Sequence, residues 1–390
     1  MFKSSKITVL ISGICALVLS MGVARYAYTP MIPYMQTQTG MSESLAGWLA
    51  GWNYLGYLTG LFIVWLINDL RVKDYIYRYG LFVALVSTLI MGIHDSPLIW
   101  YLSRFFAGIA TATGFMLGTG LVMKWLMYNN DNEKSEELGI HFSGVGLGII
   151  VGAIVVEFSG TQGLLNLSWK GQWFTLFAVG LLLFIPAMAW LPRPVEEQIR
   201  QSRVRDNRHE PSNRWLILLS MAYICAGFSN TVNVTFTSLI TELQPLEGKG
   251  GLMWVFVGLA AAPAPFIWDR IARRLGYLNA IRIAFVINII GNIWLTLSST
   301  FTATVISALT FGFAFMGIVS LVLTIIANKY RYRATQVMAR LTLGYCIAQI
   351  LSPILSGIVA EKTGSFDLSL YVVSGIMVLG LVCLLIMKRE

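Results

Sequence analysis

An arginine deep inside an apolar run is the sharpest chemical signal in this sequence. Arg25 lies in the run 7–35, about four residues past its midpoint, or about 6 Å along a helix. A cation at that depth is costly and normally faces a cavity or a partner, and this run holds no acid. Its planar guanidinium suits carboxylate or phosphate, and Tyr28 adds a hydroxyl one turn further on. Both are predicted to contact an anionic substrate, with a structural ion pair as the alternative for Arg25.

A second arginine, Arg104, lies in the outer half of the apolar run 97–127. It could contact the same anion, or it could form a salt bridge to Glu157 or Asp95, which are expected near the outer surface. No carboxylate is expected deep in the membrane, so no residue is an obvious proton carrier. Arg104 and Glu157 are the candidates for proton coupling, and exchange of one anion for another needs no carrier.

Neutral polar side chains recur one helical turn apart in other apolar runs. The pairs are Asn53 with Tyr57, Asn230 with Asn233, Asn288 with Asn292, and Tyr345 with Gln349. Amides often only bridge helices, which is the more frequent role for any one of them. As a group they predict a polar cavity opposite the arginines. The candidate substrate-binding residues are Arg25, Tyr28, Asn53, Tyr57, Arg104, Asn230, Asn233, Tyr345 and Gln349.

Two short charged segments occupy matching places in the chain. Asp69 and Asp269 each follow a long apolar run and are themselves followed by basic residues. Such helix-end charges can hold one arrangement of a transporter and release it in another, although ordinary charge asymmetry of membrane proteins also explains them. The candidate gating residues are Asp69, Arg71, Asp269, Arg270, Arg273 and Arg274.

The elements that must position these residues are membrane helices. The 390 residues are 56% hydrophobic and 12% charged, whereas soluble domains carry about 25% charge. The apolar runs have the length that crosses a bilayer. They predict an all-α protein with twelve spans, at 7–35, 44–67, 75–93, 97–127, 138–158, 170–191, 214–240, 250–268, 277–298, 302–328, 335–359 and 367–387.

The distribution of positive charge predicts the orientation. Of 28 Lys and Arg, all but five fall in loops and termini on one side of the predicted spans. The exceptions are Lys170, Lys249 and Lys362 on the other side, and Arg25 and Arg104 within spans. This asymmetry predicts that both termini are cytoplasmic. The formal charge of +9 therefore indicates topology and contact with anionic lipid, and no nucleic-acid partner is expected.

The charged stretch 192–213 divides the spans into two sets of six. We expect an N-terminal half (1–191), a cytoplasmic linker (192–213) and a C-terminal half (214–390), the repeat arrangement of one large transporter class. Glycines four residues apart, such as Gly144, Gly148 and Gly152, predict close helix packing. Prolines at 263, 265 and 353 predict kinks.

These features resemble the major facilitator superfamily. Its pattern of an acid, a basic residue and Gly-Arg-Arg is matched by Asp269–Arg274, with Ala272 in place of glycine, and only partly by Asn68–Lys73. Arg104 followed by Gly108 matches its fourth-helix pattern, and the resemblance associates that arginine with proton coupling or structural support. The runs Gly22–Pro30 and Ser143–Gly148 are similar to the YbfB-like branch of small bacterial members.

The resemblance and the arginines together favour a secondary transporter. We expect a monomer that moves a small organic anion across the bacterial inner membrane by alternating access; the substrate would be a carboxylate- or phosphate-bearing metabolite or a polycarboxylate metal chelator. The alternative is a proton-coupled drug or metabolite efflux pump, which the absence of a Gly-Pro pair in the fifth span disfavours. No enzyme activity, cofactor or metal site is expected, since the three histidines have no catalytic arrangement and His141 is interpreted as a surface residue.

Overall fold

All regular structure in the described part of the chain is helical. The computed structural model describes residues 5–41, 43–129, 136–161, 163–194, 212–243, 250–297, 300–330, 333–363 and 366–387. In chain order the elements are α1 (Lys6–Leu17), the π-helix η1 (Val18–Tyr26), α2 (Tyr28–Thr39), α3 (Glu43–Leu66), α4 (Leu70–Ile93), α5 (Pro97–Asn129), α6 (Glu136–Ser159), α7 (Trp169–Ala189), α9 (Asn213–Leu243), α10 (Gly250–Ala261), α11 (Ala264–Leu275), α12 (Tyr277–Leu297), α13 (Phe301–Lys329), α14 (Ala334–Thr363) and α15 (Asp367–Ile386).

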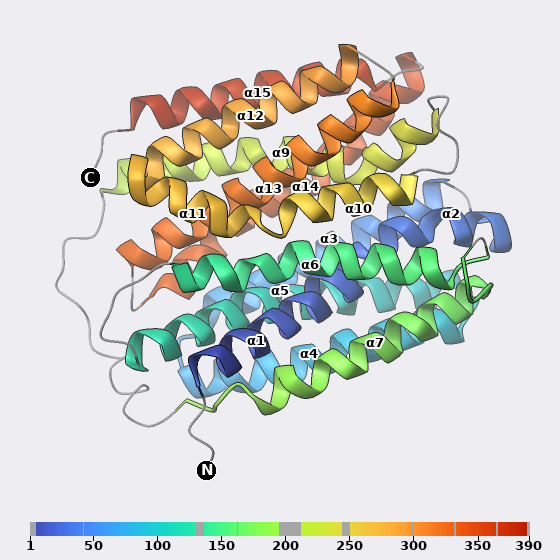
Figure 1. Cartoon of the computed structure of the whole chain (residues 1–390), viewed down its shortest axis with the longest axis horizontal. Helices are drawn as coiled ribbons and strands as arrows, with labels where there is room; N and C mark the ends of the chain where they lie inside the picture. The colour runs from blue at the N-terminus through green and yellow to red at the C-terminus, as the bar shows by residue number, and fades with distance from the viewer. Residues whose placement is uncertain are drawn as a thin grey trace.

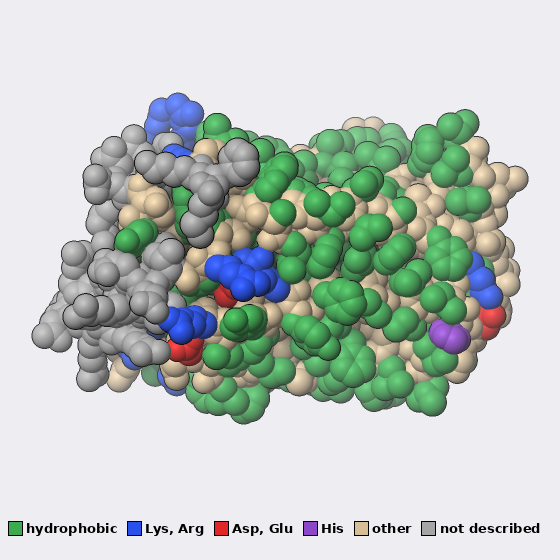
Figure 2. Space-filling view, turned by 90° about the horizontal axis from the view of Figure 1, so that it is seen from below, with side chains coloured by type: hydrophobic (Ala, Val, Ile, Leu, Met, Phe, Trp, Pro, Cys, Tyr) green, Lys and Arg blue, Asp and Glu red, His purple; other side chains and the backbone are tan. Residues whose placement is uncertain are grey.

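The helices are long enough, and the surface apolar enough, for a bundle that spans a membrane. Eleven helical segments of the described residues are long and apolar enough to cross a bilayer, and the 30-residue α14 is not among them. Figure 2 shows an apolar surface along the bundle, with charged side chains gathered toward its ends. Both termini lie at the same end, here called the termini end (Figure 1). An all-α membrane protein is thus confirmed, and the cytoplasmic placement of the termini stays a prediction.

The first span differs from the predicted single helix. It consists of α1, η1 and α2, so Arg25 lies in a π-helix of nine residues. The Ala27 N–H donates to the Gly22 carbonyl, five residues back, at 2.8 Å. Side chains of α5 bond to carbonyls of this wider helix: Arg104 Nη1 to Ala24 at 2.9 Å and Thr111 Oγ1 to Ser20 at 2.9 Å. Segments of π-helix are rare and concentrate at functional sites.

The eighth span breaks where its prolines predict. Helix α10 ends at Ala261 and α11 begins at Ala264, with Pro263 between them. Proline lacks the N–H that the ladder needs and its ring crowds the preceding turn, so the break follows from the sequence. In the eleventh span, by contrast, α14 is assigned as helix through position 353.

The helices form two groups in space. Figure 1 shows α1–α7 in the lower part and α9–α15 in the upper part. Residues 195–211 of the linker lie outside the described residues, and the predicted boundaries at 191 and 214 stay predictions. The glycine stripe of α6 faces the first span of its own group, because a Cβ added at Gly148 would lie 2.8 Å from Gly22 Cα. Gly146, off that stripe, instead contacts the break between α10 and α11 in the other group.

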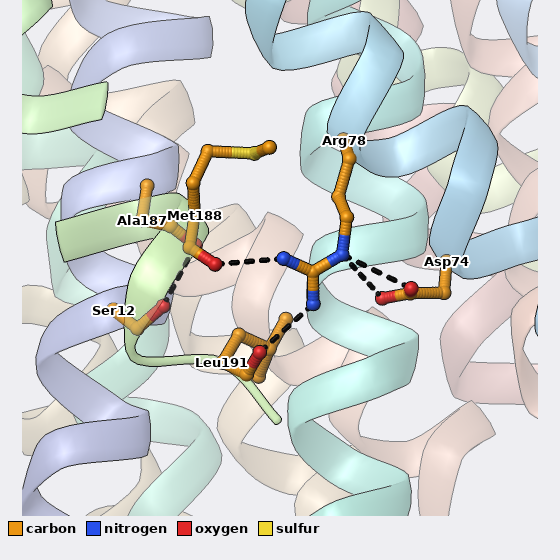
Figure 3. A network of polar contacts seen from close by, with 6 residues as sticks. All are labelled: Ser12, Asp74, Arg78, Ala187, Met188 and Leu191. Atoms are coloured by element: carbon orange, nitrogen blue, oxygen red, sulfur yellow. Dashed lines mark hydrogen bonds and ion pairs between the residues drawn. The ribbon is translucent and has the colours of Figure 1, made fainter. Parts of the chain in front are cut away.

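An arginine near the start of the third span in each group holds the end of the sixth. Figure 3 shows Arg78 of α4 bound to Asp74 at 3.0 Å and to the carbonyls of Met188 and Leu191 at 2.7 and 2.8 Å. In the second group, Arg282 of α12 donates to the carbonyls of Leu384 and Met387 at 2.7 and 3.2 Å. These carbonyls are the unpaired backbone acceptors at helix ends, so each arginine acts as a C-terminal cap.

Replacing Arg78 with Ala is expected to destabilise the protein strongly. The change leaves the Asp74 carboxylate, whose side chain is 4% exposed, without its partner, and removes the cap of α7. Breaking such a buried pair costs about 3 kcal/mol. Thermal unfolding in detergent should show a clear drop in midpoint. Arg193→Ala, an exposed arginine at the same end, is the control; an equal drop in both variants would contradict the capping role.

Candidate substrate-binding site

A small cavity lies between the two groups of helices, at the level of Arg25. Its volume is about 20 Å³, room for about one water molecule. Its lining includes side chains from η1, α3, α5, α6, α9, α13 and α14: Met21, Arg25, Tyr26, Tyr57, Phe115, Val145, Tyr223, Phe315, Met316, Val319, Thr342, Tyr345 and Gln349. Both groups of helices therefore contribute to the cavity.

Arg25 reaches across this cavity from one group of helices to the other. Its Nη2 donates to Oε1 of Gln349 on α14 at 3.3 Å. Its guanidinium lies 4.4 Å from the ring centroid of Tyr57 and 5.1 Å from that of Tyr54. Among the described residues Arg25 forms no ion pair, although its side chain is only 6% exposed. Aromatic faces and an amide soften the charge without neutralising it, so a bound anion would complete the site.

Arg104 is buried beside the cavity but does not line it. Its guanidinium lies 4.4 Å from the ring centroid of Tyr28, and Nη1 binds the Ala24 carbonyl. Among the described residues no ion pair joins Arg104 to Glu157 or Asp95, the alternative expected from the sequence; Asp95 pairs with Lys170 at 2.7 Å, and Glu157 accepts a hydrogen bond from the Tyr34 hydroxyl at 3.4 Å. Within the described residues Arg104 Nε has no hydrogen-bond partner. In this conformation Arg104 therefore positions η1, the segment that carries Arg25.

The other predicted binding residues divide into two sets. Tyr57, Tyr345 and Gln349 line the cavity, and their binding of a substrate stays a prediction. Tyr28, Asn53, Asn230 and Asn233 are not among its lining residues. Tyr28 donates to the Ala46 carbonyl at 3.1 Å, and Asn53 donates to the Arg104 carbonyl at 3.0 Å. Asn230 donates to the Tyr345 hydroxyl at 3.0 Å and so orients a lining residue. Several of the predicted polar residues therefore bridge helices, which was the alternative for each of them.

Asparagines of α9 and α12 form a buried amide network. Asn233 donates to Asn292 at 2.8 Å, and Asn292 in turn donates to the Ser229 hydroxyl at 2.8 Å. Ser229 donates to Asn288 at 2.8 Å. All four side chains are at most 1% exposed. The network joins two helices, and Asn288 extends it by donating to Asn230 at 3.4 Å, which in turn binds the cavity-lining Tyr345.

Replacing Asn292 with Leu is expected to lower stability and leave anion affinity nearly unchanged. The change strips partners from Asn233 and Ser229 in a buried place, which costs about 2 kcal/mol. The thermal midpoint should fall, while the ratio of binding constants for two test anions should stay the same. A selective change in that ratio would contradict a purely structural network.

Sequence reasoning missed part of the aromatic wall. Tyr223 lines the cavity and stacks on Tyr345, with ring centroids 4.4 Å apart. Its position seven residues before Asn230 places it on the same helical face, which is a signal that the sequence offered. Tyr26 also lines the cavity. His141, interpreted as a surface residue, is instead fully buried and shares a hydrogen bond with Thr119 at 3.1 Å, so that interpretation was wrong.

The two charged segments differ in structure. The Asp69 carboxylate caps the N-terminus of α4, accepting from the backbone N–H groups of Arg71 and Val72 at 2.8 and 3.3 Å. Asp269 lies within α11 and binds the side chains of Arg273 and Tyr277 at 2.9 and 2.8 Å. Arg71, Arg270 and Arg274 are exposed. The role of these residues in gating stays a prediction.

Contacts between the groups occur toward both ends of the molecule. At the termini end the Asn68 side chain binds Gln336 of α14. At the opposite end Glu157 of α6 lies against the start of α10, since a Cβ added at Gly251 would lie 2.7 Å from its carboxyl carbon. The small cavity thus lies between two sets of contacts that join the groups.

Spanning helices in two groups, with a buried arginine at a cavity between them, define a membrane transporter. The chain belongs to the major facilitator superfamily: residues 17–385 match the family described as "Uncharacterised MFS-type transporter YbfB". The fold and the family are thus those of transporters rather than enzymes.

Two curated relatives are similar to this chain in sequence. The "Uncharacterized MFS-type transporter YceJ" of Bacillus subtilis (strain 168) is 25% identical over 268 residues, which are 67% of this chain and 66% of that relative, just under two thirds. The "Probable sulfoacetate transporter SauU" of Cupriavidus necator is 26% identical over 322 residues, 74% of this chain and 72% of that relative.

The overall fold matches solved transporters at low sequence identity. The human organic anion transporter MFSD10 superposes with a TM-score of 0.74 at 15% identity, covering 98% of this chain and all of that one. A single-residue mutant of the nucleoside transporter NupG gives a TM-score of 0.66 at 15% identity with the same coverage. At this identity the likeness establishes the fold alone.

Proposed function

We propose that this protein is a secondary transporter that moves a small organic anion across the bacterial inner membrane by alternating access. The observation that carries the proposal is Arg25, a buried cation without an ion pair in the described residues, at a cavity that both helix groups line. An intramembrane cation of this kind is a functional residue by default. SauU is described as a probable sulfoacetate transporter and MFSD10 as an organic anion transporter, and both descriptions support an organic anion as the substrate.

The bond between Arg25 and Gln349 suggests how binding is linked to movement. Gln349 is neutral and belongs to the second group of helices, so it is a weak partner that an anion can displace. The cavity has room for about one water molecule in this conformation, so the two groups must move apart for a substrate to enter between Arg25, Tyr345 and Gln349. Contacts at the two ends then open in turn. We expect the side of the termini to be cytoplasmic, because most of the basic residues of the sequence are predicted on that side.

We propose two residues through which protons could be coupled to transport. Glu157 accepts a hydrogen bond from the Tyr34 hydroxyl and contacts the second group of helices at the end opposite the termini. Protonation of Glu157 would therefore alter a contact between the two groups at that end. Arg104 is the second candidate, through η1. Without coupling to protons, the protein would exchange one anion for another. We take the functional unit to be a monomer in contact with anionic lipid.

Flux assays with purified protein in liposomes test the proposal. Saturable uptake of labelled organic anions, competed by other anions but not by neutral analogues, is the expected result. A pH gradient should drive the uptake if protons are coupled, and trans-loaded anion should accelerate it if the protein exchanges anions. Binding without flux would instead indicate a receptor. Export of cationic dyes without any flux of anions would favour the efflux pump.

A further inference from the structure

The central cavity presents a single positive charge to a ligand. Among its lining side chains in the described part of the chain, only Arg25 is charged. Hydrogen-bonding groups come from neutral side chains, namely Tyr26, Tyr57, Tyr223, Thr342, Tyr345 and Gln349. The guanidinium is flanked by tyrosine rings, with centroids 4.4 to 5.5 Å away, so its N–H edge is the surface left for an acid group. One acid group can therefore be matched here.

The rest of the wall is apolar. It consists of Met21, Phe115, Val145, Phe315, Met316 and Val319. Phe315 is supported from behind by Phe311, with ring centroids 5.6 Å apart and planes within 10°. Apolar walls with a few polar groups bind ligands that combine an apolar body with one polar anchor.

Arg104 does not supply a second charge at this wall. It is 3% exposed, its Nη1 is bound to the Ala24 carbonyl, and the Tyr28 ring covers it. A second acid group on a ligand held by Arg25 would therefore meet neutral hydroxyl groups and apolar side chains but no second cation. Burying an unpaired carboxylate against such groups is strongly unfavourable.

We propose that the substrate is a monoanion, with one acid group on a compact apolar body such as an aromatic or branched monocarboxylate, and that dianions are rejected. This inference rests on the proposed function, since it concerns the same cavity. It separates this chain from a sulfoacetate carrier, because sulfoacetate joins a sulfonate and a carboxylate on one carbon. It also narrows the proposed class to exclude polycarboxylate chelators.

Four probes, three of which each change one feature of benzoate, test the inference in the full-length protein. Calorimetry in nanodiscs, at a mildly alkaline pH that ionises every acid group, compares benzoate with isophthalate, acetate and benzamide. Isophthalate adds a second charge, acetate lacks the ring, and benzamide lacks the charge. Benzoate is expected to bind at least about tenfold more tightly than each of the others.

A charge added to the wall should reverse the selectivity. Met316 lines the cavity and is unbranched, so Met316→Lys places a second cation on the apolar wall with little change in volume. The ratio of isophthalate to benzoate affinity is expected to rise at least about tenfold. Ser96→Lys adds the same charge at an exposed position outside the cavity and should leave the ratio unchanged.

The outcomes separate this inference from the function on which it rests. Isophthalate or sulfoacetate binding as tightly as benzoate to the unmodified protein would overturn the monoanion inference and leave an anion transporter standing. The same holds for an unchanged ratio in folded Met316→Lys. Failure of every anion to bind or move would contradict the proposed function itself. If Met316→Lys does not fold, the four-probe comparison alone decides.

Discussion

Arg25→Gln is expected to abolish anion binding and transport in a protein that still folds. Glutamine keeps a hydrogen-bonding group near Gln349 but removes the charge that an anion would meet. Loss of one partner of a buried charged pair costs about 3 kcal/mol, or about 100-fold in affinity. Arg25→Lys should retain part of the activity, because it keeps the charge and loses the planar fork. Uptake in liposomes and anion-induced thermal stabilisation measure both effects.

An exposed arginine serves as the control that distinguishes loss of the binding site from loss of one positive charge anywhere in the protein. Arg193→Gln removes an exposed arginine outside the cavity and should transport like the unmodified protein. The thermal midpoint of Arg25→Gln without ligand should stay equal or rise, since the variant no longer buries a cation lacking an ion pair. Normal transport by Arg25→Gln would refute the anion site at this position.

Gly146→Leu is expected to stop transport by preventing closure, without unfolding either group of helices. A Cβ at Gly146 would lie 2.5 Å from the carbonyl carbon of Ala261 and closer still to Ala262, across the boundary between the groups. Overlap of this kind costs about 2 kcal/mol, which shifts a two-state population by about 30-fold. The closed conformation should therefore become minor.

The native Cys346 can report this shift. It is fully buried near the cavity, with its Sγ 3.6 Å from the Tyr54 carbonyl. With Cys15, Cys225 and Cys383 replaced by Ala, labelling of Cys346 by a hydrophilic maleimide should be slow, and Gly146→Leu should accelerate it.

Two glycine variants serve as comparisons for Gly146→Leu. Gly148→Ala meets Gly22 within one group and should lower the thermal midpoint instead, because that clash is present in every conformation. Gly51→Ala meets no atom within 4 Å and should change neither property. Slow labelling in folded Gly146→Leu would contradict the role assigned to this contact.

The sequence predicts those features that depend on single segments. Runs of apolar residues have to match the bilayer, so the spans follow from length and composition. The break at Pro263 follows from a missing N–H. Arg25, Tyr57, Tyr345 and Gln349 lie at the cavity because polar groups in apolar runs must turn away from lipid.

Features that depend on distant segments could not be predicted in this way. The spacing of Asn230 and Asn233 gives a shared helical face, but the partners across that face come from α12 and α14. Arg104 finds a backbone carbonyl of η1 instead of an acid, and the sequence of η1 alone gives no reason for its wider turn. The stripe at Gly144, Gly148 and Gly152 predicted close packing without identifying the helix it meets.

The wide turn of η1 makes the length of this segment as important as its composition. An α-helix advances about 100° per residue and a π-helix less, so the same residues between Val18 and Arg25 wound as ordinary α-helix would turn Arg25 by about that angle relative to α1. The guanidinium would then leave the cavity although every side chain type was kept. A homologue that lacks one residue here could wind as ordinary α-helix and return its arginine to the direction of the cavity, so insertions or deletions in this stretch carry functional information that substitution scores overlook.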